Sequence, residues 1–174
     1  STLEQIIDFS DIFVTIKAYH QDQTKSASER YTQLKAALQT QINNAKIGIS
    51  TAQELYDFSI SVSYNFDQPA TSDRVPFLNT IGYLMSQNYV LLADIDYSTM
   101  RAFKFIPIGI QLAIPGKTAI NLPFKGSFDG QGYTISSLYL ADYNYITMIN
   151  VDGTTAIDYA FSPYYAIFSL ERKL

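Results

Sequence analysis

Apolar and polar residues follow two different periods along this chain, and the change of period divides it into two parts. Near the N-terminus, the apolar runs at 6–9 and 12–16 are short and rich in β-branched residues, which predicts strands or an extended arm. Ser26 and Glu29 then match a capping box, so a helix is expected from about Ser28 to Lys46. Gly48 is expected to end this helix, because glycine accepts a left-handed backbone most easily.

The predicted helix carries one narrow apolar stripe, whose members recur at spacings of three and four residues: Tyr31, Leu34, Leu38, Ile42 and Ala45. Such a stripe either packs on the adjoining domain or meets copies of itself around an axis. Packing within the chain is favoured, because the helix spans fewer than three heptads. Self-association stays open as the alternative.

The second part of the chain has the two-residue period of strands. Phe124, Gly126 and Phe128 share one face, the pair Asp129-Gly130 supplies a turn, and 134–140 resumes the pattern. Gly126, Gly130 and Gly132 are therefore interpreted as turn and close-packing glycines. Three excursions between the strand segments are expected to be loops, at 59–79, 111–122 and 143–163.

The order of these segments resembles the opening module of bacterial and phage surface proteins built from GLUG-type β-helix repeats. The resemblance covers about residues 49–140, and its motifs are Thr51-Ala52-Gln53-Glu54-Leu55, Asp94-Ile95-Asp96, Pro107-Ile108-Gly109 and the glycine-rich run that begins at Phe124. It implies a mainly β fold: the opening rungs of a right-handed parallel β-helix (solenoid), preceded by an extended arm and one long helix. The run 165–169 lacks the glycines with which the next rung of such proteins begins.

Two regions are expected on this basis. Residues 1–48 would form an N-terminal arm and helix used for anchoring or oligomerisation, and 49–174 a β-solenoid-like domain with loop insertions. One clear copy of the motif is present, whereas solenoids gain stability from stacking about three or more repeats.

Charge and composition exclude several classes of partner. The net charge is -4 without a basic patch, which argues against nucleic acid. The chain has no cysteine, so it has neither a disulfide framework nor a thiolate metal site. No run of 18 apolar residues occurs, which argues against membrane insertion. The 14 tyrosines and 11 phenylalanines suit large contact surfaces, although most are expected to be ordinary sheet residues.

Candidate chemistry is sparse. His20, the only histidine, is expected to be solvated. Asp94 and Asp96 are two apart on a predicted strand, so with Asp129 they could bind Ca²⁺ or perform acid–base chemistry. The favoured interpretation is structural, because an aspartate at a strand end accepts hydrogen bonds from turn amides. No catalytic residue, metal or cofactor is therefore assigned.

These observations favour a non-enzymatic structural or attachment module of a phage fibre (tail or head) or a similar surface protein, located on a virion or at the cell surface. Expected partners are proteins of a larger assembly and other copies of the chain, with a trimer favoured because fibrous surface proteins are often trimers. A cell-surface glycan is a further candidate. The alternatives are the N-terminal part of a carbohydrate-active β-helix enzyme (polysaccharide lyase or glycosidase) and a bacterial surface adhesin.

Overall fold

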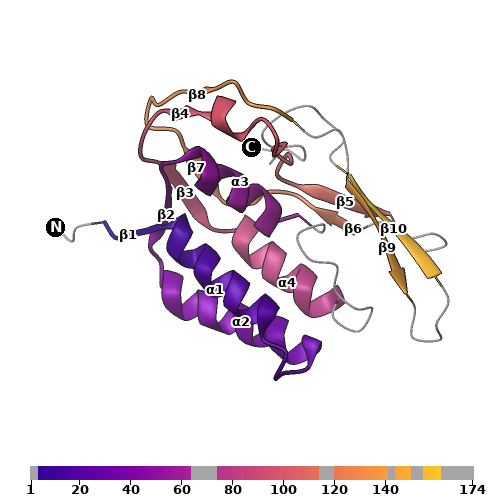
Figure 1. Ribbon diagram of the computed structural model, residues 1–174. Coiled ribbons are helices and arrows are strands. Elements are labelled where there is room, and N and C mark those ends of the chain that lie inside the picture. Colours follow the sequence, from indigo (N-terminus) through magenta and orange to yellow (C-terminus); the bar gives the residue numbers. More distant parts are fainter. Residues whose placement is uncertain (1–3, 64–73, 114–119, 141–143, 150–154, 162–174) are drawn as a thin grey trace.

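Helices and a small parallel sheet share one apolar core. The computed structural model describes residues 4–63, 74–113, 120–140, 144–149 and 155–161 (Figure 1). Within them lie four α-helices and one short 3-10 helix: α1 Phe9–Gln21, α2 Ala27–Ile42, α3 Ala52–Ser61, α4 Arg74–Met85 and η2 Tyr97–Met100. Helix α1 packs against α2 and α3, and α2 packs against α4.

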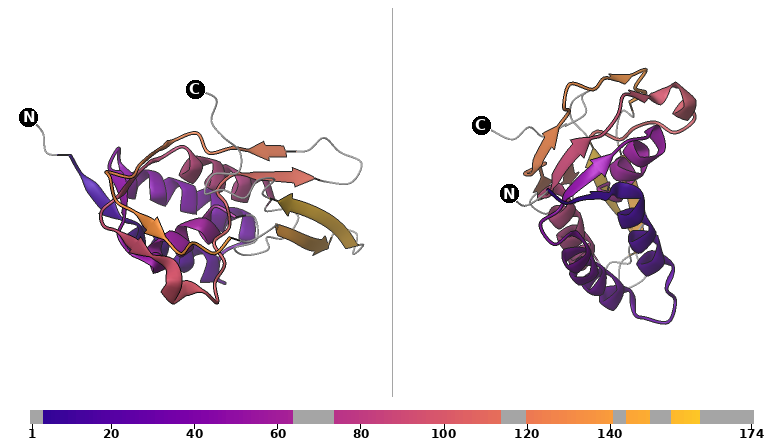
Figure 2. Two further views of the ribbon diagram at one scale, coloured as in Figure 1. Left: turned by 90° about the horizontal axis from the view of Figure 1, so that it is seen from above. Right: turned by 90° about the vertical axis from the view of Figure 1, so that its left-hand side faces the viewer.

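The parallel sheet has the strand order β1-β2-β3-β7. Its strands are Ile6–Asp8, Lys46–Ile49, Asn88–Leu91 and Ser127–Asp129. The register places Ile47 beside Tyr89, and Tyr89 beside Phe128, so these side chains form one row on the sheet face that joins the core. Figure 2 shows these strands on one side of α1 and α2.

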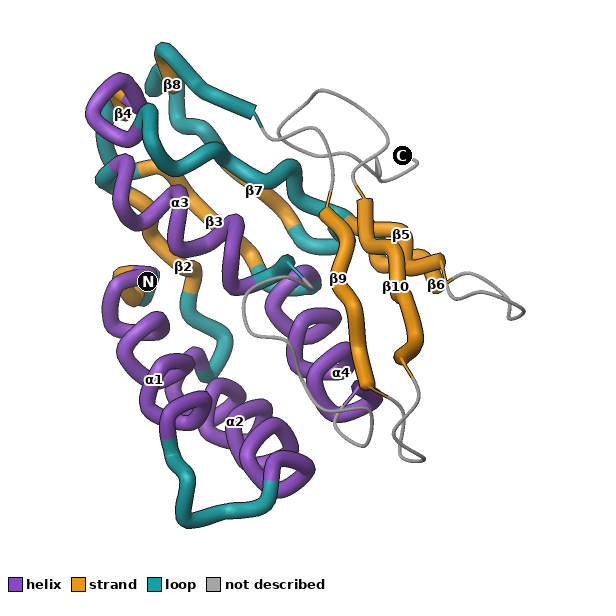
Figure 3. The backbone as a smooth tube through the Cα atoms, turned by 45° about the vertical axis from the view of Figure 1, so that its right-hand side comes forward, coloured by secondary structure: helices purple, strands orange, loops and turns teal. Residues whose placement is uncertain are grey.

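Two further sheets complete the described chain. Strand β4 (Ile95–Asp96) pairs in parallel with β8 (Ile135–Ser136), and an isolated parallel bridge joins Phe105 to Leu140. An antiparallel sheet has the order β6-β5-β10-β9, from strands Ile120–Leu122, Ile110–Ala113, Thr155–Phe161 and Asn144–Ile149. Figure 3 shows this antiparallel sheet standing apart from β2 and β3.

The expected fold class is wrong: the residues that the structure describes do not form the opening rungs of a right-handed β-helix solenoid. The expected single long helix is replaced by four α-helices, and the strands are short and divided among small sheets, one of them antiparallel. The run 12–16 lies in α1 because Ile12 and Ile16 share a buried helix face with Phe9. Helix α4 begins inside the expected loop at 59–79 and takes up its last part, and Pro76 fits there because the first turn of a helix needs no backbone donor.

The other two expected loops also contain strands. Strands β5 and β6 account for much of 111–122, and β9 and β10 for much of 143–163. The expected run at 165–169 lies outside the described residues.

Helix α2 begins where the capping box indicates but ends earlier than expected. The amide of Glu29 donates to Ser26 Oγ at 3.3 Å, which caps the helix. The helix ends at Ile42 because Asn43 takes the left-handed conformation, with φ 41°. Gly48 has a different role, since it lies in β2 where a Cβ would come within 2.5 Å of Leu92 Cδ1.

The apolar stripe of α2 is covered within the chain. Tyr31, Leu34, Leu38 and Ile42 are at most 1% exposed, whereas Ala45 is partly exposed and lies beyond the helix. The stripe therefore packs against the core of the same chain.

The N-terminal part belongs to the same core as the rest. The boundary expected between residues 48 and 49 falls inside β2, which pairs with β1 on one side and β3 on the other. Phe9 and Ile12 are fully buried in the cluster that also contains Phe58 and Tyr89. One face of α1, a helix that was expected in part to be an anchoring arm, therefore packs in the interior.

Candidate interaction surface

The three aspartates singled out by the sequence each accept a hydrogen bond from a backbone amide. Asp94 Oδ1 accepts from the amide of Thr134 at 2.8 Å, which joins the residue before β4 to the residue before β8. Asp96 Oδ1 accepts from the amide of Ser98 at 3.0 Å and caps η2. Asp129 Oδ1 accepts from the amide of Gln131 at 3.0 Å, within its own turn.

These contacts define what the carboxylates do in the described chain. The amide of Ser98, and then its hydroxyl, hold the pKa of Asp96 below its usual value, because both hydrogen bonds favour the charged form. Among the described residues, no group of three or more histidine, aspartate or glutamate side chains is placed to hold a metal ion. In the described chain these aspartates therefore bind backbone amides at turns and strand ends. Their geometry does not support the alternative in which Asp94 and Asp96 act as a catalytic or metal-binding acid pair.

The remaining motif residues lie in turns and close contacts. Gly109 and Gly132 have φ values of 100° and 79°, which other residues rarely adopt. A Cβ on Gly126 would lie 1.8 Å from the carbonyl oxygen of Gln87, so only glycine fits there. The other members are Pro107, which is buried, Phe124, which is 6% exposed, Phe128, which is half-buried in β7, and Gly130, which follows that strand.

Glu54 is a buried carboxylate whose importance the sequence did not reveal. It is 6% exposed, and its Oε2 accepts from the amide of Ser10 at 3.0 Å, while Oε1 accepts from the amide and hydroxyl of Ser50 at 3.2 and 2.8 Å. These donors lie at the start of α1 and just before α3, where unpaired amides attract negative charge. The Thr51-Glu54 capping pattern was its only local signal, because Ser10 is distant in sequence.

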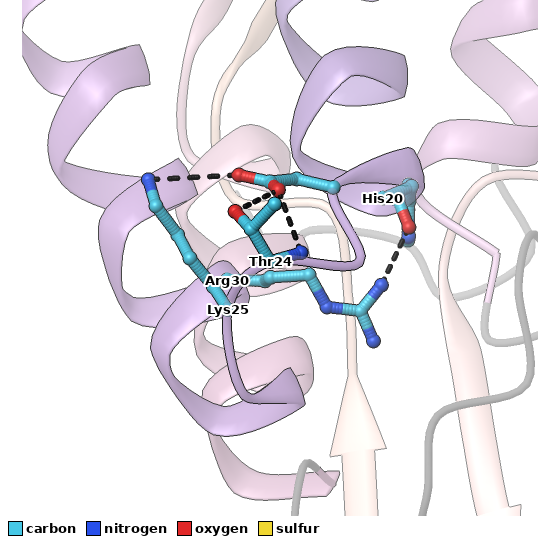
Figure 4. Close-up of polar contacts among 5 residues, drawn as sticks. His20, Thr24, Lys25 and Arg30 are labelled. Carbon is cyan, nitrogen blue, oxygen red and sulfur yellow. Dashed lines mark hydrogen bonds and ion pairs between the residues drawn. The ribbon is translucent and has the colours of Figure 1, made fainter.

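The connection between α1 and α2 forms a polar corner, defined by residues 19–31. Asp22 accepts from the amide and hydroxyl of Thr24, at 3.0 and 2.5 Å, and pairs with Lys25 Nζ at 3.8 Å (Figure 4). Arg30 Nη1 donates to the carbonyl oxygen of His20 at 2.5 Å. The polar groups of this corner are thus directed at one another.

His20 itself is buried, so the expectation of a solvated histidine is wrong. It is 7% exposed, its Nδ1 lies 3.1 Å from the hydroxyl of Tyr31, and its ring meets those of Tyr31 and Phe77 edge-on. His20 therefore joins three helices, because it comes from α1 while its neighbours come from α2 and α4. The helical spacing of Phe9, Ile12, Ile16 and His20 was the signal that could have revealed this.

A second connection, around η2, is also held by several hydrogen bonds, but it exposes aromatic side chains to solvent. Tyr97 is fully buried, and its hydroxyl donates to the carbonyl oxygen of Phe103 at 2.8 Å. The amide of Phe103 donates to the carbonyl oxygen of Met100 at 2.8 Å. The amide of Phe105 donates to the carbonyl oxygen of Tyr139 at 2.6 Å. These bonds fix the backbone of the turn and bring 139 alongside it.

Aromatic side chains make two separate contacts at this turn. Phe103 is 51% exposed, and its ring centre lies 5.3 Å from that of the half-buried Tyr56 on α3. Tyr139 is 44% exposed, and the Arg101 guanidinium carbon lies 5.9 Å from its ring centre. We call this set, with the neighbouring Lys104, the turn surface: Tyr56, Arg101, Phe103, Lys104 and Tyr139.

The two cations of the turn surface are exposed, and within the described chain neither forms an ion pair. The nearby carboxyl group of Asp57 is only 8% exposed and accepts from Gln53 Nε2 at 2.9 Å. Burial raises the pKa of Asp57, since it disfavours the charged form. The turn surface therefore presents aromatic rings and positive charge to solvent.

Sequence reasoning did not select the turn surface. Its members come from α3, the turn after η2 and the segment after β8, so they are assembled by the fold. The abundance of tyrosine pointed to contact surfaces in general but marked no position.

Comparisons with known proteins give one partial likeness. No family model matches the chain, and no solved structure matches it. A stretch of 55 residues, 29% of this chain, is 49% identical to halomucin of Haloquadratum walsbyi, of which it covers 1%. The match thus spans a very small part of that protein. In the described residues, no helix combines the length and apolar character needed to cross a membrane.

Proposed function

We propose that this chain is a non-enzymatic attachment module of a larger surface or virion protein, and that it makes contact through the turn surface. The observation that carries this proposal is the exposure of Phe103 and Tyr139 on a backbone fixed by Tyr97. Aromatic side chains with few rotatable bonds provide contact area at low entropic cost. A rigid support reduces that cost further, because little has to be ordered on binding.

The proposed location is the surface of a cell or virion. The partial likeness to halomucin, a surface protein, supports a surface location. A phage fibre and a bacterial adhesin both remain within the proposal. Assembly with other copies, with a trimer favoured, also stays a prediction.

The carbohydrate-active enzyme alternative has no supporting observation in the described residues. It required a pair of acids across a cleft, whereas Asp94 and Asp96 are each bound to a backbone amide. It also relied on a β-helix, which the chain does not form.

The proposal is tested by measuring retention of the chain on a panel of immobilised surfaces: neutral and acidic polysaccharides, and vesicles with and without anionic lipid. We expect retention on at least one of them, and we expect the double substitution F103A/Y139A to reduce it by about tenfold or more. Val14→Ala is the matched control, because Val14 is a 62% exposed apolar residue on α1. Equal retention of wild type and F103A/Y139A, or no retention anywhere, would contradict the proposal.

A further inference from the structure

We propose that the turn surface binds an acidic carbohydrate, one whose sugars carry carboxylate or sulfate groups. This inference rests on the proposed attachment function and names its ligand. It combines two observations: solvent-facing rings at the turn, and two exposed cations that flank one of them in sequence.

The rings supply the apolar half of the site. The C–H groups on one side of a pyranose ring carry slight positive charge, and the face of an aromatic ring is negative, so the two stack favourably. Phe103 is 51% exposed and tilted by 55° from the ring of Tyr56, so the pair forms an angled platform and not a closed stack. Tyr139 adds a second exposed ring with a hydroxyl group at its tip.

The cations supply the acidic preference. Arg101 and Lys104 flank Phe103 in sequence, and within the described chain neither has a carboxylate partner. Arginine binds carboxylate and sulfate groups through paired donors, and lysine binds them as a point charge. The guanidinium of Arg101 already lies over Tyr139, so a charged sugar held by Arg101 would come close to an aromatic ring.

The negative net charge of the protein confines the expected attraction for acidic sugars to the turn surface. With a net charge of -4, the chain as a whole repels anions, so an acidic polymer would not bind through nonspecific attraction. Asp57 is only 8% exposed and accepts from Gln53, and the carboxylate of Asp96 accepts from the amide of Ser98. An acidic sugar is therefore directed to Arg101 and Lys104, which form no ion pair within the described residues.

An anionic membrane is the other source of negative charge, and the turn surface fits it less well. Recognition of anionic lipid headgroups commonly uses clusters of four to eight basic residues. The turn surface contributes two, Arg101 and Lys104. Two cations beside a ring platform match a single sugar unit more closely than a charged plane.

The experiment measures the dissociation constant of an oligogalacturonate at low salt, with a neutral malto-oligosaccharide and phosphatidylserine vesicles as comparison probes. We expect the oligogalacturonate to bind, and R101Q/K104Q to weaken it by about tenfold or more, since each lost charge contact is worth roughly 1 kcal/mol. The matched control is K35Q/K125Q, which removes the same charge from α2 and from the segment before β7 and should change binding by less than about twofold.

The outcomes separate this inference from the proposed function. If the neutral sugar binds as tightly as the acidic one, and F103A/Y139A abolishes both, the acidic preference is wrong and attachment through the turn surface stands. If only the vesicles bind, and R101Q/K104Q releases them, the ligand is a membrane and the carbohydrate assignment is wrong. If no probe responds to either double variant, the carbohydrate assignment is wrong, and retention on the wider panel of surfaces decides the proposed function separately.

Discussion

The polar corner at 19–31 and the turn surface are both connections between secondary-structure elements, yet they use similar residues in opposite ways. In the corner, Arg30 donates to His20 and Lys25 pairs with Asp22, while the ring of Tyr31 is 1% exposed. At the turn surface, the cations have no ion-pair partner in the described chain and Phe103 is half exposed. In the corner, the polar side chains are bonded to one another and stabilise the fold. At the turn surface, the cations and exposed rings are available to a ligand.

The largest effect should separate the two regions by stability. Tyr31→Ala removes a ring that packs on His20 and Phe77, so we expect the free energy of unfolding to fall by about 3–5 kcal/mol. Tyr139→Ala, at the turn surface, should change it by no more than about 0.5 kcal/mol. Chemical denaturation of both variants measures the difference. Equal losses would remove the distinction between the regions.

A smaller effect isolates the hydrogen bond inside the corner. Tyr31→Phe keeps the ring but deletes the hydroxyl that lies 3.1 Å from His20 Nδ1, so we expect a loss of about 1 kcal/mol. Tyr133→Phe is the matched control, because Tyr133 is 43% exposed. A Tyr31→Phe variant as stable as its control would mean that the hydroxyl contributes nothing to the corner.

Asp57, beside the turn surface, should oppose folding when it is charged. Burial raises its pKa, so the folded protein holds this proton more tightly, and stability is lost as pH rises from the usual 3.8 through the raised value. Asp57→Asn should therefore stabilise the protein at neutral pH by about 1 kcal/mol or less, because Asn can still accept from Gln53. This gain should disappear at low pH in thermal unfolding. A variant less stable than wild type at pH 7 would show that the charged form is favoured.

The smallest effect concerns Asp22, a partly exposed member of the polar corner. The hydroxyl and then the amide of Thr24 hold its pKa below the usual 3.8. The contribution of Asp22 is therefore fully present above that value and is lost as pH falls through the lowered pKa. Asp22→Asn should flatten this acidic part of the stability curve and slightly lower the free energy of unfolding at higher pH, where the contribution of Asp22 is present. A curve identical to that of wild type would show that the contact does not contribute.

Local signals in the sequence predicted part of this fold. The capping pattern at Ser26 marked the start of α2, because the groups that satisfy a helix start lie within a few residues of it. Thr51 caps α3 in the same way, although that pattern was not used as a helix signal. The glycines at 126 and 132 were also correctly interpreted: a Cβ at 126 would collide with the backbone of Gln87, and Gly132 has a positive φ. Helix α1 was missed because β-branched runs favour strands, and here burial against α2 and α3 outweighed that preference.

The candidate site was less accessible to sequence reasoning. The aspartates were singled out in the sequence because two carboxylates on one strand face can bind a cation or act as acid and base. In the structure, each accepts a hydrogen bond from a backbone amide. Phe103 meets Tyr56, and Arg101 meets Tyr139, across dozens of residues of sequence. Such pairings depend on how α3, η2 and β8 are placed, which a single sequence with one copy of a motif does not determine.

The most direct test of binding at the turn surface is a titration of the isotope-labelled protein with oligogalacturonate, followed through the backbone amide shifts in nuclear magnetic resonance spectra. The largest changes should fall at Arg101 to Lys104 and at Tyr139, while the amides of 19–31 stay in place. Changes centred on the polar corner, or no changes at saturating sugar, would contradict the assignment of the turn surface as the binding face for acidic sugars.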